Sequence, residues 1–239
     1  MQVDIQLLPL APKPALLSER TIVVIDVLRA TSVMVHAMSQ GALEIVPVTT
    51  VEEAYQLKSS FPPGTTLLGG ERGSRRIEGF DLGNSPREYV SQTVRGKRLI
   101  LTTTNGTRAF HLVASGYEIL VASFFNIGAI AKRCVAQDRN IFIFPSGDEG
   151  NFSLEDTVCG GMLMDRMVWG QRWWDLTDAA RAALMLYQRF KEDLIEPLRL
   201  SKHGRDLVTL ELGEDLLFCA QPDTTDLVPI FKDGMIRLL

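Results

Sequence analysis

The stretch RLILTTTNGTRAFHLVAS, residues 98–115, passes from an apolar run through small polar residues into an amphipathic segment. The apolar run at 98–103 predicts a buried strand, and the segment at 107–115 has the length and pattern of a crossover helix. Between them, Asn105-Gly106 supplies a tight turn, because glycine adopts backbone angles that strain other residues. The stretch therefore predicts a strand, a turn and a helix, which is the repeating unit of α/β folds.

The same unit recurs through the first two thirds of the chain. Further strands are predicted at 21–28, 43–48, 65–70, 117–123 and 140–146, and further helices at 32–40, 51–60, 86–94 and 126–137. The predicted strands are almost continuously apolar, which indicates burial on both faces of a sheet. We therefore expect an α/β fold of three layers, α/β/α, with a mostly parallel or mixed sheet.

The C-terminal third has a different pattern. Long helical segments are predicted at 153–170 and 175–194, followed by a hairpin at 228–238 whose turn is Asp233-Gly234. This helical third either covers a face of the sheet or acts as a lid, and the sequence leaves both open. From the length of 239 residues we expect a single α/β domain spanning residues 1–239.

The composition excludes several classes of protein. Hydrophobic residues make up 46% of the chain and charged residues 23%, as in ordinary globular proteins. The net charge is −4 with no basic stripe, so no nucleic-acid partner is expected. No signal-peptide pattern or long apolar run is present, so we expect a cytoplasmic protein without membrane contact. Cys134, Cys159 and Cys219 are widely spaced, which favours buried free thiols, and a homo-oligomer is left open on general grounds.

Polar residues collect where the predicted strands end. Ligands of open α/β sheets bind beyond the carboxyl ends of the strands. Asp26 ends a strand that otherwise consists of isoleucine and valine. It is either a helix N-cap or an ion-pair partner of Arg29, or else a magnesium ligand or nucleophile, since a buried carboxylate needs a cation nearby to stay ionised.

Three loops add candidates at the same edge. TTTNGT, residues 102–107, is either an anion cradle at a helix start or a turn capped by threonine. The loops at 69–74 and 79–86 are rich in small residues, so they are either plain turns or sites where the backbone approaches a ligand.

The stretch SGDEGNFSLED, residues 146–156, contains the carboxylates of Asp148, Glu149, Glu155 and Asp156. Ser153 followed by Asp156 predicts a capping box at a helix start, so Glu155 is the better candidate for metal binding or acid–base chemistry. A few carboxylates plus water suit Mg²⁺, and the scarcity of histidine argues against zinc. The three histidines, His36, His111 and His203, are expected to be structural.

Five motifs in order carry a resemblance to a known family. DVLRATS (26–32), GGERG (69–73), GFDLGNSP (79–86), TTTNGT (102–107) and SLEDTVCGG (153–161) together resemble the 2-phosphosulfolactate phosphatase family over roughly residues 20–165. The resemblance implies a three-layer α/β fold. It also implies Mg²⁺-dependent hydrolysis of a small anionic ester, the phosphate ester of a 2-hydroxy carboxylic acid, linked to coenzyme M synthesis.

The resemblance and the strand-end pattern together give an expected site. The expected catalytic residues are Asp26, Arg29 and Glu155. The expected substrate-binding residues are Thr31, Ser32, Arg72, Asn84, Ser85, Thr103, Thr104, Asn105, Gly106 and Thr107. The expected metal ligands are Asp26, Glu71, Asp81, Glu155 and Asp156.

Two other functions compete with this interpretation. A haloacid-dehalogenase-type phosphatase carries a second aspartate two residues after the first, and Leu28 stands at that position here. A non-catalytic binder of small anions would use the same threonine-rich cradle. Such a binder gains nothing from carboxylates beside its ligand, because they repel an anion.

Overall fold

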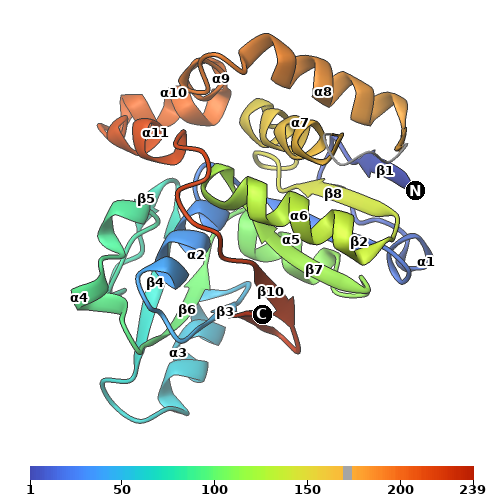
Figure 1. Cartoon of the computed structure of the whole chain (residues 1–239). Helices are drawn as coiled ribbons and strands as arrows, with labels where there is room; N and C mark the ends of the chain where they lie inside the picture. Colours follow the sequence, from blue (N-terminus) through green and yellow to red (C-terminus); the bar gives the residue numbers. More distant parts are fainter. Residues whose placement is uncertain (169–173) are drawn as a thin grey trace.

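A computed structural model describes residues 1–168 and 174–239 (Figure 1). Its described strands are β1 (Gln2–Ile5), β2 (Thr21–Ile25), β3 (Glu44–Pro47), β4 (Thr66–Arg72), β5 (Arg75–Arg76), β6 (Arg98–Thr102), β7 (Glu118–Ala122), β8 (Ile141–Pro145), β9 (Asp175–Leu176), β10 (Pro229–Lys232) and β11 (Met235–Leu238). They form one sheet in the order β5-β4-β6-β3-β11-β10-β7-β2-β8-β1-β9. All six strands predicted from the sequence are present, as β2, β3, β4, β6, β7 and β8.

Helices cover both faces of this sheet. They are α1 (Pro14–Leu17), α2 (Ala30–Ser39), α3 (Val51–Ser59), α4 (Ser91–Val94), α5 (Gly106–Leu112), α6 (Ile127–Gln137), α7 (Leu154–Val168), α8 (Asp178–Phe190), α9 (Ile195–Leu200), α10 (Lys202–Thr209) and α11 (Glu214–Cys219). In β2, Val23 and Ile25 pack into a core with α6, α7 and α8. Ile22 and Val24, on the other face, pack against α2 and α5. The expected three-layer α/β fold is confirmed.

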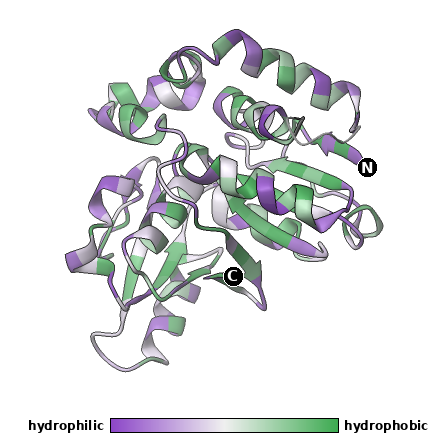
Figure 2. Cartoon of the chain, viewed as in Figure 1, coloured by the Kyte–Doolittle hydropathy of each residue, from purple (hydrophilic) through white to green (hydrophobic). Residues whose placement is uncertain are grey.

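The colouring by hydropathy follows these layers. The central strands are largely hydrophobic, whereas the outer helix α8 carries both hydrophobic and hydrophilic residues (Figure 2). α8 packs on α7 rather than directly on the sheet centre. Part of the C-terminal third therefore covers a face of the sheet, which is one of the two arrangements that the sequence left open. The three cysteines are buried and free, as predicted.

The predicted helix at 86–94 is wrong in its length. The segment forms a 3₁₀ turn, Pro86–Glu88, and the short helix α4. Tyr89, between them, is buried and donates a hydrogen bond of 2.7 Å to the Gly83 carbonyl. This bond ties the segment to the preceding loop, so a continuous helix does not form.

The C-terminal hairpin lies inside the sheet, between β7 and β3. Its turn is the predicted one, but its place was not predicted. The pairs β7–β10, β10–β11 and β11–β3 are all antiparallel, so β3, β6 and β4 run opposite in sense to β7, β2 and β8. Neighbouring strands twist by roughly 20–25°, so five steps from β6 to β2 accumulate roughly 100–125°. This twist brings the carboxyl ends of the two strand groups toward each other.

Within the described residues, no helix is long and apolar enough to cross a membrane.

Candidate active site

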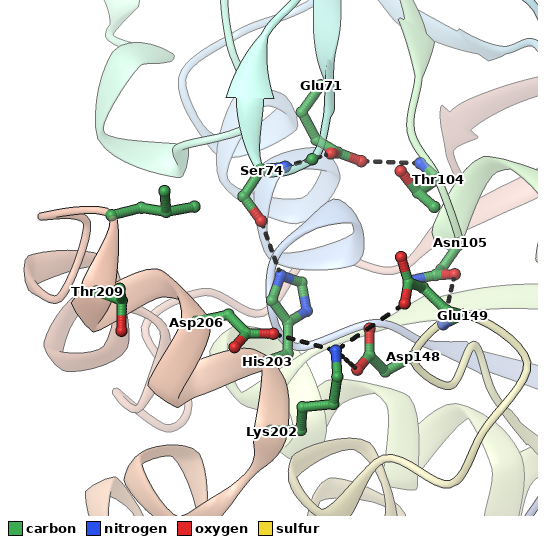
Figure 3. A pocket seen from close by; sticks show the side chains of 12 residues that line it. Glu71, Ser74, Thr104, Asn105, Asp148, Glu149, Lys202, His203, Asp206 and Thr209 are labelled. Atoms are coloured by element: carbon green, nitrogen blue, oxygen red, sulfur yellow. Dashed lines mark hydrogen bonds and ion pairs between the residues drawn. The ribbon is translucent and has the colours of Figure 1, made fainter.

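Four segments meet around a cavity of about 350 Å³ (Figure 3). Glu71 and Ser74 come from the end of β4 and the turn after it, and Thr104 and Asn105 from the turn after β6. Asp148 and Glu149 follow β8, and Lys202, His203 and Asp206 belong to α10. The cavity therefore lies beyond the carboxyl ends of strands from both groups, β4 and β6 on one side and β8 on the other, and helix α10 of the C-terminal third lines it as well.

Asp26 directly follows β2 and does not line this cavity, but it lies close enough to Glu71, which does, for the charge of Glu71 to raise its pKa. Its Oδ1 accepts a hydrogen bond of 3.0 Å from the Ala30 N–H, and its side chain is 95% buried. A Cβ added to Gly106 would stand 2.6 Å from Asp26 Oδ2, so only glycine permits this approach. The pKa of Asp26 is raised to about 7, mainly by burial and also by the negative charges of Glu155 and Glu71, while the Ala30 N–H and the charge of Arg29 act in the opposite direction.

Glu155 and Asp156 lie in the first turn of α7. The pKa of Glu155 is raised to about 7, mainly by burial and also by the charge of Asp148, although the hydroxyls of Ser153 and Ser201 act to lower it. Glu155 Oε2 is buried and receives no hydrogen bond from any described residue. Burial, together with the charges of Glu155 and Asp26, holds the pKa of Asp156 well above its ordinary range.

The predicted capping box is half present. The Ser153 hydroxyl accepts from the Asp156 N–H at 3.2 Å, as an N-cap does. Among the described residues no hydrogen bond from the Ser153 N–H to the Asp156 carboxylate completes the box; Asp156 Oδ1 accepts from the Val27 N–H at 2.8 Å, and the Ser153 hydroxyl lowers the pKa of Asp156. Asp156 thereby ties α7 to the end of β2 and positions its neighbours Asp26 and Glu155.

Within the described residues the three buried carboxylates lack an ion-pair partner, although the charge of Arg29 lowers the pKa of Asp26. No lysine, arginine or histidine in residues 1–168 and 174–239 forms an ion pair with Asp26, Glu155 or Asp156. The alternative ion pair of Asp26 with Arg29 is not formed, since Arg29 Nη1 lies 2.8 Å from Asp215 Oδ2. Burial and the neighbouring acidic groups disfavour the ionised forms of these carboxylates, and a nearby cation would favour them.

The predicted set of five metal ligands is not assembled. No three histidine, cysteine or acidic side chains of the described chain are arranged to hold a metal ion. Asp81 is the clearest miss, because its loop folds back along β4 and its Oδ2 lies 2.7 Å from Lys58 Nζ on α3. Glu71 accepts from the backbone N–H groups of Thr104 and Ser74, both at 2.8 Å. Asp156 is bonded to the Val27 N–H. Of the five predicted metal ligands, Asp26 and Glu155 therefore remain as candidates.

These two carboxylates fit one kind of metal site. Mg²⁺ usually binds through one or two carboxylates and keeps waters or substrate phosphate as its other ligands. The buried oxygen of Glu155 that lacks a donor, beside the Asp26 carboxylate, has the chemistry of such a partial ligand set.

The TTTNGT turn is mainly a capped turn. The Thr103 N–H donates to the Thr107 hydroxyl and the Thr107 N–H donates to the Thr103 hydroxyl, both at 3.1 Å. These hydroxyls therefore hold the turn together rather than a substrate. The Thr104 N–H, one of the groups that an anion cradle in this stretch would use, donates to Glu71 Oε1. Thr104 and Asn105 do line the cavity, and their contact with a substrate stays a prediction.

Other predicted substrate contacts have structural partners. The Thr31 hydroxyl bonds to the backbone of Asp26, and the Ser32 hydroxyl donates to the Val27 carbonyl at 2.8 Å. Both shape the turn after β2.

Arg72 and Ser85, two more predicted substrate contacts, do not line the cavity. Arg72 donates to the Glu71 carbonyl at 2.7 Å and to the Thr102 hydroxyl at 3.0 Å. Ser85 donates to Asp215 at 2.6 Å. Arg29 and Asn84 line a second cavity instead.

Two residues of α10 were missed by the sequence analysis. Lys202 Nζ lies 2.9 Å from Asp148 Oδ2 and 3.0 Å from Asp206 Oδ2 (Figure 3). These carboxylates raise the pKa of Lys202, so it stays charged. His203, expected to be structural, lines the cavity with Nε2 3.4 Å from the Ser74 hydroxyl, and burial lowers its pKa. No motif marks these residues, and the only local signal is the Ser201 N-cap before them.

Known proteins resemble this chain over most of its length. The family model for "2-phosphosulpholactate phosphatase" matches residues 9–234. The chain belongs to this family. A "probable 2-phosphosulfolactate phosphatase" of Caldanaerobacter subterraneus subsp. tengcongensis is 41% identical over 221 residues, which cover 92% of this chain and 91% of the relative.

Two further relatives are also named "probable 2-phosphosulfolactate phosphatase". The protein of Symbiobacterium thermophilum is 40% identical, covering 93% of this chain and 96% of the relative. The protein of Clostridium botulinum (strain Eklund 17B / Type B) is 36% identical over the full length of both chains. The family match extends beyond the motif region at 20–165 and includes α10, which supplies Lys202 and His203 to the cavity.

Proposed function

We propose that this protein is a Mg²⁺-dependent phosphatase that hydrolyses phosphate esters of 2-hydroxy carboxylic acids. The preferred substrate is 2-phosphosulfolactate, converted to 3-sulfolactate and phosphate. Membership of the 2-phosphosulfolactate phosphatase family supports the reaction. The main observation in support of a metal site for this reaction is the pair of buried carboxylates, Asp26 and Glu155, which form no ion pair among the described residues.

The charge of the cavity supports a need for a cation. Its lining contains the acidic groups of Glu71, Asp148, Glu149 and Asp206, against the single ammonium of Lys202 among the described lining residues. A phosphate ester that enters this cavity alone meets net negative charge. A bound divalent cation reverses that repulsion and, in phosphoryl transfer, neutralises charge on the transferring group.

The protein's own groups have separate roles in this proposal. Asp26 and Glu155 would hold the cation, and both would be ionised there because a nearby cation favours the charged form of a carboxyl group. Asp156 positions them through the Val27 N–H. Lys202 lines the cavity with a side chain that is 57% exposed, and it attracts the anionic substrate.

His203 is suited to moving a proton. Its pKa is lowered by burial, so the imidazole is neutral at pH 7 and free to accept a proton. Its Nε2 lies beside the Ser74 hydroxyl, which fixes the direction of the ring. The same acidic lining disfavours a non-catalytic anion binder, because such a protein has no use for carboxylates that repel its ligand. A cytoplasmic location and a homo-oligomer stay predictions.

The test is phosphate release from 2-phosphosulfolactate and from 2-phospholactate, each with Mg²⁺ and with a chelator. We expect release from both that depends on Mg²⁺ and is faster for the sulfonate. Mg²⁺-independent release would contradict the role of the two carboxylates. No release from either ester would contradict the proposed substrate class.

A further inference from the structure

A second cavity, of about 310 Å³, adjoins the first. Ser74 and Leu210 line both cavities and so form the wall between them. The charged groups of the second cavity are different: it is lined by Arg29, by Arg75 and Arg76 of β5, and by Glu88 of the 3₁₀ turn. The proposed catalytic function makes no use of this cavity.

Arg29 is fixed in place but has an unused donor. It is 98% buried, with Nη1 2.8 Å from Asp215 Oδ2 and Nη2 2.8 Å from the Ser74 carbonyl. The Ser85 hydroxyl donates to the other oxygen of Asp215 at 2.6 Å and holds that carboxylate in turn. Arg29 Nε is buried and has no hydrogen-bond partner among the described residues. A buried donor without a partner is unfavourable, so this N–H is available to a ligand.

The remaining lining groups are also available. Arg75 and Arg76 are exposed, and neither side chain forms an ion pair or hydrogen bond within residues 1–168 and 174–239. Asn84 is buried, lines the cavity, and its amide makes no hydrogen bond to another described residue. Glu88 is the opposing charge, and its Oε2 accepts from the Gly83 N–H at 2.8 Å.

The charges of the two cavities have opposite signs. In the second, Asp215 offsets Arg29 and Glu88 offsets one of the exposed arginines, which leaves a net positive charge of one. The first is net negative, as its lining residues show. An anionic group is therefore repelled from the first cavity and attracted to the second, on the other side of Ser74.

We propose that the second cavity is a binding site for an oxyanion group, a sulfonate, carboxylate or phosphate. Arginine presents paired N–H groups that match the oxygens of such anions. Arg75 and Arg76 close on the anion from the exposed side, while Arg29 Nε and the Asn84 amide contact it from the buried side. The anion is either free in solution or the acid end of a substrate whose phosphate lies beyond Ser74, and the second source rests on the proposed function.

The site is tested by binding of sulfate, measured calorimetrically in the presence of a chelator. Without a divalent cation the carboxylate cavity repels sulfate, so binding reports on the arginine cavity. The variant is Arg75→Gln/Arg76→Gln, and the control is Arg181→Gln/Arg199→Gln. The control removes two exposed arginines of α8 and α9 and changes the net charge equally.

We expect the dissociation constant for sulfate to rise by about tenfold or more in Arg75→Gln/Arg76→Gln and to stay near wild type in the control. Equal weakening in both double variants would show a nonspecific charge effect and overturn the site. Binding to Arg75→Gln/Arg76→Gln as tight as to wild type, or no measurable binding to wild type, would also overturn it. The unfolding temperature of each variant is measured alongside, so that a folding defect is recognised.

A kinetic comparison separates the two sources of the anion. If the site takes the acid end of the substrate, Arg75→Gln/Arg76→Gln raises KM for 2-phosphosulfolactate with little change in kcat. If the site takes a free anion, sulfate binding is lost while KM stays at the wild-type value. Both results support the anion site. Failure of the phosphatase assay alone leaves the calorimetric test intact.

Discussion

Replacing Asp26 by asparagine removes a carboxylate that is hard to ionise in the folded protein. Its ordinary pKa is 3.8 and its folded value is about 7. Folded protein therefore binds more protons than unfolded protein between these values, so stability falls as pH rises through this range. A shift of about three pKa units corresponds to about 4 kcal/mol, the upper bound for the loss at alkaline pH.

The asparagine side chain resembles the neutral form of the acid and does not ionise, so the variant avoids this loss. Without metal at about pH 8, Asp26→Asn should be more stable than wild type by up to about 4 kcal/mol, or about 10 °C in Tm. At about pH 5, where wild-type Asp26 is protonated, the two should unfold at similar temperatures. Thermal unfolding with a chelator at both pH values measures the effect.

Asp178→Asn is the matched control, since Asp178 is exposed in the first turn of α8. It removes the same charge far from the carboxylate cluster, so its effect should be small at both pH values. A lower Tm for Asp26→Asn than for wild type at about pH 8 would refute the argument. A wild-type Tm that does not fall between the two pH values would refute it as well.

The other predictions follow from single contacts. Gly106→Ala places a Cβ 2.6 Å from Asp26 Oδ2; it should lower stability by about 1–3 kcal/mol and reduce kcat, whereas Gly213→Ala, with its nearest neighbour at 3.4 Å, should do neither. Lys202→Gln should raise KM by about tenfold with a smaller effect on kcat, and an unchanged KM would contradict its role in attracting the substrate. Added Mg²⁺ should raise the Tm of wild type at alkaline pH and should raise that of Glu155→Gln much less; an equal rise in both would remove Glu155 from the metal site.

The sequence predicted the strands well and their arrangement only in part. β2, β6 and β8 are short runs of apolar residues buried on both faces, so local pattern is enough to find them. The place of the C-terminal hairpin depends on the pairings of Phe231 with Ile119 and of Ile236 with Ile45. These join residues more than a hundred positions apart, and no local pattern encodes them.

The sequence indicates candidate site residues only where their chemistry stands out in the local pattern. Asp26 and Glu155 were selected because a carboxylate at a strand end or a helix start stands out in an apolar context, and the structure buries both, while their roles stay predictions. Asp81 belongs to a motif but is turned toward Lys58 by the course of its loop. Lys202 and His203 were missed because the packing of α10 over the strand ends brings them to the cavity.

The most direct test of the central claim is the rate of phosphate release from 2-phosphosulfolactate by Asp26→Asn at saturating Mg²⁺, beside wild type and Asp178→Asn. The account predicts that Asp26→Asn loses at least about a hundredfold in kcat while Asp178→Asn keeps the wild-type rate. Because Asp26→Asn is predicted to be no less stable, a loss of rate cannot be ascribed to unfolding. A wild-type kcat with unchanged Mg²⁺ affinity in Asp26→Asn would contradict the claim that this carboxylate forms the catalytic centre.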